Sequence, residues 1–219
     1  MSTSVKICGL STPETMEAAL KAGADMVGLV FFQNSPRHVT LEVAKELAAR
    51  ASQRAEVVAL TVDADDAALD AIVRALAPEY LQLHGRETPE RVEEIQRKFG
   101  VSAIKALGVS EAADFAMADA YKAADALLID AKPPRGATRP GGNGIAFDWR
   151  LARGFAPRKP WMLSGGLDAG NIGEAIRLSL ARSVDVSSGV ESAPGVKDPA
   201  KIRAFIDAAR MAFDAADAE

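Results

Sequence analysis

The feature that most constrains the fold of this chain is a pairing, repeated eight times, of a short apolar run with a longer stretch of helical pattern. Continuous apolar runs such as residues 26–31 are typical of strands covered on both faces of a parallel sheet. Capping residues mark helix starts, as in Thr12 followed by Pro13 and as in Ser110. We predict strands over residues 5–8, 26–31, 56–61, 80–83, 101–107, 126–129, 161–163 and 184–186, and helices over 12–21, 40–51, 65–76, 88–98, 110–123, 147–153, 168–180 and 199–213.

Strands that alternate with helices form a parallel sheet, and eight such pairs in 219 residues are the number expected of a closed barrel. An open doubly wound sheet is the alternative, but no glycine-rich dinucleotide-binding turn follows the first predicted strand. No linker or low-complexity segment divides the chain. We therefore predict an α/β fold, a single-domain (β/α)8 TIM barrel that spans residues 1–219.

Charge and apolar content exclude several classes of protein. The chain carries 26 basic and 30 acidic residues, a net charge of −4, so its overall field does not favour nucleic acid or an anionic membrane. No apolar run approaches bilayer-spanning length, and residues 1–4 lead into the first strand without the features of an export signal. The single cysteine, Cys8, excludes an internal disulfide. We therefore expect a cytoplasmic protein with no nucleic-acid or membrane partner.

Residues that end the strands of such a barrel meet at one rim, where these barrels place their sites. The segment over residues 131–144 has three prolines and four glycines, too many for regular structure, and long loops are usually functional. The predicted rim combines a thiol, a guanidinium, an imidazole, a carboxyl group and two glycine-rich turns. Its residues are Cys8, Arg37, His84, Asp130, Gly165, Gly166, Ser187, Ser188 and Gly189.

The glycine-rich turns after the seventh and eighth predicted strands indicate a phosphate site. Glycine bares backbone N–H groups just before a helix start, and these loops commonly hold phosphate in such barrels. Glycines that serve only tight turns are the alternative for either loop, but the two loops together favour phosphate. In the ring order, a phosphate held there lies between Asp130 and Cys8, so a sugar phosphate would have an acid on one flank and a thiol on the other.

The other rim residues each allow a structural and a functional interpretation. Cys8 is either a small buried hydrophobe or a nucleophile or base, and Asp130 either organises the proline-rich loop or reacts. Arg37 is either a solvated charge or a two-pronged grip on a carboxylate, and His84 makes either a structural hydrogen bond or a catalytic one. Lys6 shares the inward face with Cys8, needs an anionic or hydrogen-bonding partner that the sequence does not name, and would favour the thiolate.

Seven motifs run in order across nearly the whole chain. They are residues 5–10 (VKICGL), Phe32 with Ser35-Pro36-Arg37, residues 81–85 (LQLHG), 127–130 (LLID), 141–144 (GGNG) with Phe147-Asp148-Trp149, 163–167 (LSGGL) with Asn171, and 185–191 (DVSSGVE) with Lys197-Asp198. Together these motifs resemble those of the phosphoribosylanthranilate isomerases of tryptophan biosynthesis. Two departures from the family pattern are Asn143, where Thr is usual, and Ser164, where Ala is common.

The resemblance implies an Amadori rearrangement of N-(5-phosphoribosyl)anthranilate into the carboxyphenylamino-deoxyribulose phosphate, without a metal or redox cofactor. By this analogy Asp130 is the general acid that protonates the ring oxygen, and Cys8 is the base that takes the proton from sugar C2. Arg37 is assigned to the anthranilate or phosphate end of the substrate. The remaining substrate-binding residues are His84, Gly142, Gly165, Gly166, Ser187, Ser188 and Gly189.

Three other functions compete with this one. The related isomerase of histidine biosynthesis resembles it but has an aspartate at the end of the first strand, where this chain has Cys8. Indole-glycerol phosphate synthase needs a catalytic lysine at the mouth, and none is suitably placed in the sequence. A non-catalytic sugar-phosphate sensor would have no reason to keep both Cys8 and Asp130. Oligomeric state stays open between a monomer and a homodimer.

Overall fold

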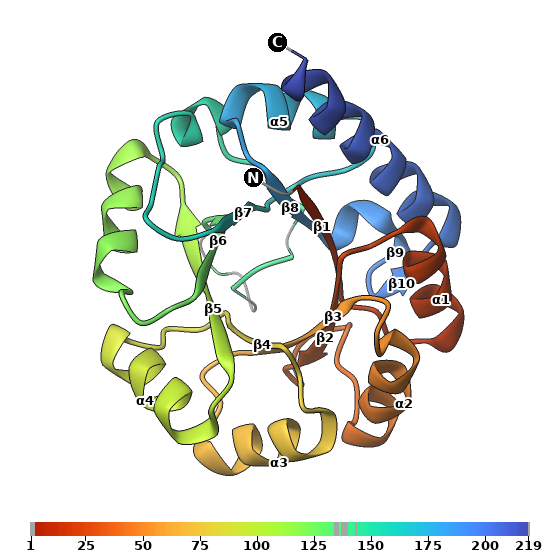
Figure 1. The fold of residues 1–219 in the computed structure, drawn as a ribbon, viewed down its shortest axis with the longest axis vertical. Helices are drawn as coiled ribbons and strands as arrows, with labels where there is room; N and C mark the ends of the chain where they lie inside the picture. Colours follow the sequence, from red (N-terminus) through yellow and green to blue (C-terminus); the bar gives the residue numbers. More distant parts are fainter. Residues whose placement is uncertain (1–2, 134–135, 137–139, 143, 219) are drawn as a thin grey trace.

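In the computed structural model, eight parallel strands close into a barrel in the order β1 to β8, with helices around it (Figure 1). The structure describes residues 3–133, 136, 140–142 and 144–218. The predicted (β/α)8 barrel is therefore confirmed. Its strands are β1 (Ser4–Cys8), β2 (Met26–Phe31), β3 (Glu56–Thr61), β4 (Tyr80–Leu83), β5 (Ser102–Val109), β6 (Ala126–Ala131), β7 (Trp161–Leu163) and β8 (Ser183–Val186).

Within the described residues, six α-helices and three 3-10 helices follow the strands. The helices predicted after the fifth and sixth strands are present over shorter ranges, and both are 3-10 helices. Phe115, Phe155 and Trp161 fill the space beside these turns, with ring centroids 4.8 and 5.3 Å apart along the row. The helices are α1 (Pro13–Ala22), α2 (Leu41–Ala51), α3 (Asp66–Leu76), α4 (Pro89–Phe99), η1 (Ala112–Ala120), η2 (Trp149–Ala152), α5 (Ile172–Ser179), η3 (Ser188–Val190) and α6 (Pro199–Asp217).

Helix α5 begins four residues later than the sequence predicts. The carboxylate of Asp168 accepts hydrogen bonds from the backbone N–H groups of Gly170 and Asn171, at 2.8 and 3.0 Å. Such a local side-chain bond offers the backbone an alternative to the helix. Asn171 in turn donates to the carbonyl of Gly166 at 2.9 Å, so the turn is tied to the loop after β7.

The barrel closes where the first strand pairs with the last. Strand β1 runs parallel to β8, with Lys6 opposite Asp185 and Ile7 opposite Val186. On its other side β1 pairs with β2, where Cys8 is opposite Gly28. A Cβ on Gly28 would lie only 2.9 Å from the Cys8 sulfur, so this glycine makes room for the thiol. The seam therefore fixes the position of Cys8 from both neighbouring strands.

Apolar side chains form two shells around the strands. The outer shell fills the space between strands and helices, for example with Val5 and Ile7 of β1 and Phe205 of α6. The inner shell includes a cluster beneath the mouth in which Cys8 packs with Val30 and Leu60. Lys6 and Cys8 therefore do share the inward face, as the alternation of side chains predicts.

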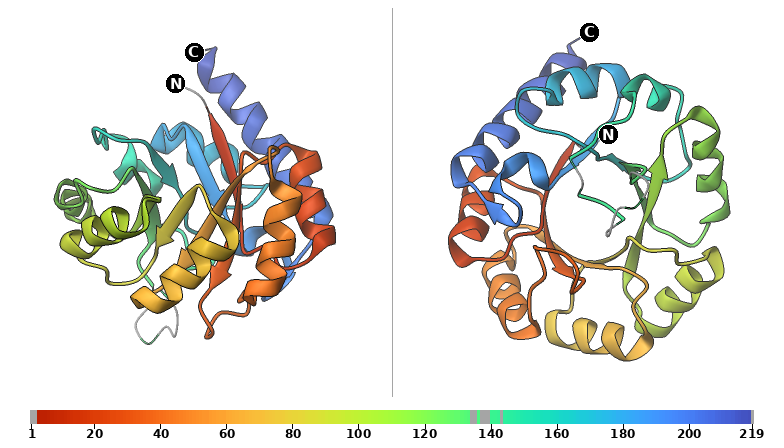
Figure 2. Two further views of the ribbon diagram at one scale, coloured as in Figure 1. Left: turned by 60° about the horizontal axis from the view of Figure 1, so that its bottom comes forward. Right: turned by 180° about the vertical axis from the view of Figure 1, so that it is seen from behind.

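The beginning of β1 and the end of α6 lie at the opposite end of the barrel from the loop that follows β2 (Figure 2, left). The loops that carry the predicted site residues therefore gather at one end. None of the helices in the described part of the chain has both the length and the apolar character needed to cross a bilayer.

A small antiparallel hairpin interrupts the barrel rhythm between η3 and α6, and the sequence did not predict it. It consists of β9 (Glu191–Ala193) and β10 (Val196–Lys197). Gly195 at its tip has φ +83°, and a Cβ there would lie 2.4 Å from the carbonyl oxygen of Pro36. The hairpin therefore packs directly against the segment between β2 and α2.

Truncating the Phe205 side chain should strongly destabilise the fold. Phe205 is fully buried between α6 and the barrel, so Phe205→Ala should lower the free energy of unfolding by about 3–5 kcal/mol. Met211→Ala on the same helix is the control, because that side chain is 72% exposed and the change should stay within about 0.5 kcal/mol. Urea denaturation measures both values, and equal losses would contradict this account of the core.

Candidate active site

A cavity opens at the end of the barrel where the predicted site residues gather. Its empty space is about 790 Å³, part of it open to solvent. Every predicted site residue except Gly189 lines it. Those residues are Cys8, Arg37, His84, Asp130, Gly142, Gly165, Gly166, Ser187 and Ser188.

A buried ion pair lies beneath the thiol. Lys6 is fully buried, and its ammonium donates to the Asp185 carboxylate at 2.8 Å, across the seam between β1 and β8. The hydroxyl of Ser164 donates to the second carboxylate oxygen at 3.2 Å. Burial is the largest single influence and would lower the pKa of Lys6, but the charges and hydrogen bonds of Asp185 and Cys8 together outweigh it and raise that pKa above its ordinary value. Asp185 is therefore the partner that Lys6 requires.

Cys8 ends β1 and is only 4% exposed. Burial raises the pKa of its thiol, and the charge of Lys6 lowers it by less than burial raises it. The nearby Asp185 carboxylate adds to the rise, and Lys197 opposes it. Lys6 thus lowers the pKa of the thiol, as predicted, but the net pKa of Cys8 is above its ordinary value.

Asp130 lies within β6, one residue before its end, rather than after the strand as predicted. One carboxylate oxygen accepts the N–H of Ala131 at 2.8 Å, and the other lies 3.4 Å from Nε2 of His84. Nδ1 of His84 is 2.9 Å from the side-chain nitrogen of Gln82. With Gln82 as the donor to Nδ1, the proton of His84 is on Nε2 and faces Asp130.

The loop after β6 comes down directly on the His84–Asp130 pair. A Cβ on Gly141 would lie 2.5 Å from Nε2 of His84 and 2.8 Å from the Asp130 carboxylate. The described parts of this loop cross the centre of the ring in Figure 1. Only glycine therefore fits at this position, and the loop screens the carboxyl group from one side.

Arg37 is not a solvated surface charge, so that sequence interpretation is wrong, whereas its binding of a substrate carboxylate stays a prediction. It is 4% exposed, and its Nε and Nη2 donate to the two carboxylate oxygens of Glu191 at 2.6 and 2.9 Å. Nη2 also lies 3.4 Å from the carbonyl oxygen of Gly142. One edge of the guanidinium is therefore occupied within the protein, and the rest faces the cavity beside Gly142.

Gly165 and Gly166, in the loop after β7, adopt φ +91° and +65°, which favour glycine. Within the described part of the chain, their backbone N–H groups donate to no acceptor. They line the cavity and are not followed at once by a helix, because α5 starts only at Ile172. Two free donors at the mouth suit an anionic ligand.

The loop after β8 approaches the loop after β7 at Gly189. This glycine is not among the residues that line the cavity, and a Cβ there would lie 1.9 Å from the carbonyl oxygen of Leu167. Its role in substrate binding stays a prediction. Its small size serves the contact between the loops after β7 and β8. Ser187 does line the cavity, and its hydroxyl donates to the carbonyl of Cys8 at 3.1 Å. Only a three-residue 3-10 turn, Ser188–Val190, follows instead of a helix start.

Comparison with known proteins gives one family. The family model described as N-(5'phosphoribosyl)anthranilate (PRA) isomerase matches residues 5–208. The N-(5'-phosphoribosyl)anthranilate isomerase of Nitrobacter winogradskyi is 59% identical over 213 residues, which is 97% of this chain and 95% of that protein.

Two solved structures are also similar. One is a phosphoribosyl anthranilate isomerase in complex with reduced 1-(o-carboxyphenylamino)-1-deoxyribulose 5-phosphate, with TM-score 0.83 and 31% identity over 95% of this chain and 99% of that one. The other shows mutually generated monomers of the dimeric isomerase from Thermotoga maritima, with TM-score 0.82, 32% identity and the same coverage.

The chain belongs to the N-(5'-phosphoribosyl)anthranilate isomerase family. Its members carry the name of an enzyme, so this chain is an enzyme of the isomerase class. Of the two departures from the family pattern, Ser164 binds Asp185, and Asn143 lies outside the described residues.

Sequence reasoning missed several residues that structure this isomerase site. Asp185 and Gln82 lie on inward faces, a position that alternation along the strand predicts. Lys132 lines the cavity as well, and its ammonium is held by Asp114. Glu191 and Lys197 had no recognised role, because only the hairpin brings them to Arg37.

The thiol of Cys8 should titrate above the ordinary cysteine pKa of about 8.5, because burial disfavours the thiolate. Since Cys8 is the only cysteine, the ultraviolet absorbance of the thiolate reports on it alone once a Cys8→Ser variant has been subtracted. A pH titration of this difference measures the midpoint. A midpoint at or below 8.5 would contradict the account of the buried thiol.

Proposed function

We propose that this enzyme isomerises N-(5'-phosphoribosyl)anthranilate by an Amadori rearrangement, with Asp130 as general acid and Cys8 as general base. The observation that carries this proposal is that both groups line one cavity together with the glycine-rich loop after β7. The ring order of the strands separates them, since β7 and β8 lie between β6 and β1. An acid and a base so placed can act on one sugar from different sides.

Ring opening is the step assigned to Asp130. Its carboxyl proton moves to the furanose ring oxygen, the bond between that oxygen and C1 breaks, and the anthranilate nitrogen forms a double bond to C1. The product of this step is an open-chain Schiff base, and Asp130 is left as a carboxylate. His84 Nε2 faces that carboxylate at 3.4 Å, so a hydrogen-bond donor stands beside the developing negative charge.

Proton removal from C2 is the step assigned to Cys8. The thiolate takes this proton, the electron pair forms the C1–C2 double bond, and the Schiff-base nitrogen becomes a neutral amine. The resulting enolamine loses its O2 proton and gains one at C1, which gives the ketone. Only the thiolate accepts a proton, and the Lys6 ammonium beneath the sulfur opposes the effect of burial on its pKa. Proton transfers of this kind supply about 10²- to 10⁴-fold each.

Two anion sites support binding of this substrate. The free N–H groups of Gly165 and Gly166 suit the phosphate, and the cavity-facing part of Arg37 suits the anthranilate carboxylate. The solved relative in complex with a reduced carboxyphenylamino-deoxyribulose phosphate supports a sugar phosphate of this type. Ser187, Ser188 and Gly142 complete the proposed lining.

We also propose that residues 1–219 act as one domain, because α6 packs against β1 and α1 and so joins the end of the chain to its beginning. We place the enzyme in the cytoplasm, where its single free thiol is kept reduced. A monomer and a homodimer both stay open. The dimeric relative from Thermotoga maritima makes light scattering of the purified protein the informative measurement.

Purified enzyme should convert phosphoribosylanthranilate, whose fluorescence reports its consumption. We expect the signal to decay at a rate proportional to the enzyme concentration, with the deoxyribulose phosphate as product. Boiled enzyme and substrate alone serve as controls for spontaneous breakdown. Stoichiometric binding of the substrate without turnover would instead indicate a sugar-phosphate sensor.

Replacing either catalytic group should abolish turnover while preserving binding. We expect Cys8→Ala and Asp130→Asn each to lower kcat by about 10²- to 10⁴-fold or more, because each group acts in the transition state. The dissociation constant of the reduced product analogue should change less than about threefold in each variant, since phosphate and carboxylate contacts remain. Normal turnover by either variant would refute the role assigned to that residue.

A further inference from the structure

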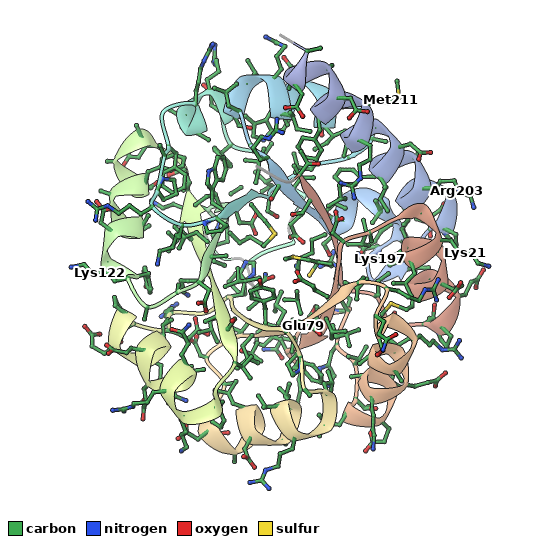
Figure 3. The ribbon with its side chains drawn as sticks, in the orientation of Figure 1. Lys21, Glu79, Lys122, Lys197, Arg203 and Met211 are labelled. Carbon is green, nitrogen blue, oxygen red and sulfur yellow. The ribbon has the colours of Figure 1, made fainter. Side chains whose placement is uncertain are left out.

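Three buried charged side chains next to the cavity have no role in the proton transfers. Arg37, Glu191 and Lys197 are exposed by only 4, 8 and 5%. Figure 3 shows Lys197 inside the ring of helices, whereas Lys21 and Arg203 point outward. Buried charges are expensive unless paired, so a cluster of three calls for an explanation.

The hairpin β9–β10 places the Glu191 side chain against Arg37. Glu191 opens β9, Lys197 closes β10, and the tip residue Gly195 packs against Pro36, the neighbour of Arg37. The N–H of Gly195 donates to the Glu191 carboxylate at 3.2 Å, which holds that carboxylate from the hairpin side. The Glu191 carboxylate is therefore held by the backbone of its own hairpin as well as by Arg37.

Glu191 determines which part of Arg37 is left for a ligand. Its two oxygens take Nε and Nη2, in the parallel two-bond geometry that orients a guanidinium most strongly. The stem of Arg37 packs on Gly9, where a Cβ would lie 2.6 Å from Cδ. Nη1 points to Gly142, where a Cβ would lie 2.6 Å from that nitrogen. The guanidinium consequently has one orientation, in which Glu191 holds Nε and Nη2, and Nη1 lies beside Gly142 in the wall of the cavity.

Lys197 links this arrangement to the loop after β8. Its ammonium donates to Glu191 at 2.9 Å and to the carbonyl and hydroxyl oxygens of Ser187 at 2.7 and 3.1 Å. An ammonium has three donors, so none remains for a ligand. The hydroxyl of Ser187 continues the chain to the carbonyl of Cys8. Arg37, the loop after β8 and the end of β1 are thus parts of one hydrogen-bonded network.

The cluster has an excess of one positive charge, since two cations surround one carboxylate. Burial lowers the pKa of Lys197, and the Glu191 carboxylate only partly compensates. Burial alone would raise the pKa of Glu191, but Arg37 and Lys197 outweigh it and hold that pKa below its ordinary value, so the carboxylate stays ionised. An anionic ligand group at Arg37 would balance the excess.

We propose that Glu191 is a positioning residue that sets the orientation of Arg37 for the aromatic carboxylate of the substrate, and that Lys197 keeps this carboxylate site in register with the phosphate loops. This inference rests on the proposed function, because it assigns the carboxylate to Arg37. It predicts selectivity for ligands that carry both anions at a fixed separation.

The test compares Glu191→Gln with wild type on three ligands: the reduced product analogue, the same molecule without its carboxylate, and ribose 5-phosphate. Gln keeps the size of Glu191, but its amide is uncharged and has only one acceptor oxygen, so it cannot accept hydrogen bonds from both Nε and Nη2 of Arg37. We expect affinity for the full analogue to fall about tenfold to a hundredfold and affinity for the other two ligands to change less than about twofold. KM should rise by more than kcat falls.

Three further variants separate positioning from a structural role. Glu17→Gln is the matched control, because Glu17 also binds an arginine, Arg54, with two bonds, at 2.8 and 3.0 Å, but far from the mouth. It should leave all three affinities unchanged. If the Gln variant does not fold, Glu191→Asp replaces it in the test. The same loss of affinity for the full analogue alone is expected. In an Arg37→Lys background, Glu191→Gln should have little additional effect, because it acts through Arg37.

The outcomes distinguish this inference from the proposed function. Equal losses for all three ligands, or no loss for the full analogue, would overturn the positioning role of Glu191. Carboxylate-dependent binding that Glu191→Gln abolishes, in an enzyme that does not turn over phosphoribosylanthranilate, would support this inference and refute the proposed function. If the wild type turned over phosphoribosylanthranilate but bound the analogues with and without the carboxylate equally well, the proposed function would be supported and this inference refuted.

Discussion

The pairing of β1 with β8 is the constraint on which the rest of the site depends. It joins residues 179 positions apart, places Lys6 opposite Asp185 and brings Ser187 to the carbonyl of Cys8. Closing such a long loop carries a chain-entropy cost that grows only slowly with loop length. One seam therefore both completes the barrel and assembles the thiol, the buried ion pair beneath it and the loop after β8.

The electrostatics of the mouth follow from which charges are paired inside the protein. Lys6 is neutralised by Asp185, and Glu191 neutralises only one of its two cationic neighbours. The flank beside β1 and β2 therefore keeps one uncompensated positive charge, whereas Asp130 and His84 stand on the other flank. In a mouth of low dielectric, this asymmetry orients a ligand with a carboxylate and a phosphate before any chemistry begins.

Much of the fold could be predicted from the sequence, because strand and helix patterns are local. Asp130 could be placed at the mouth from its position at the end of an apolar run. The pairing of Lys6 could not, since it depends on the register of two strands at opposite ends of the chain. Burial raises the pKa of Cys8 by more than Lys6 lowers it, so the net shift is opposite to the one expected from Lys6. The orientation of Arg37 depends on Glu191, which the hairpin places beside it. The close approach of Gly189 to Leu167 could not be predicted either, because it depends on how the loops after β7 and β8 pack together.

The central claim is that a sugar held by its phosphate has the Cys8 sulfur on one side and the Asp130 carboxyl group on the other. A crystal structure of this chain with the reduced product analogue tests it most directly. We expect the sulfur about 3–3.5 Å from C2 and a carboxyl oxygen of Asp130 within hydrogen-bond distance of the former ring oxygen, on opposite faces of the chain of carbons. A complex in which either group faces away from the sugar, or in which both approach it from the same side, would contradict the account.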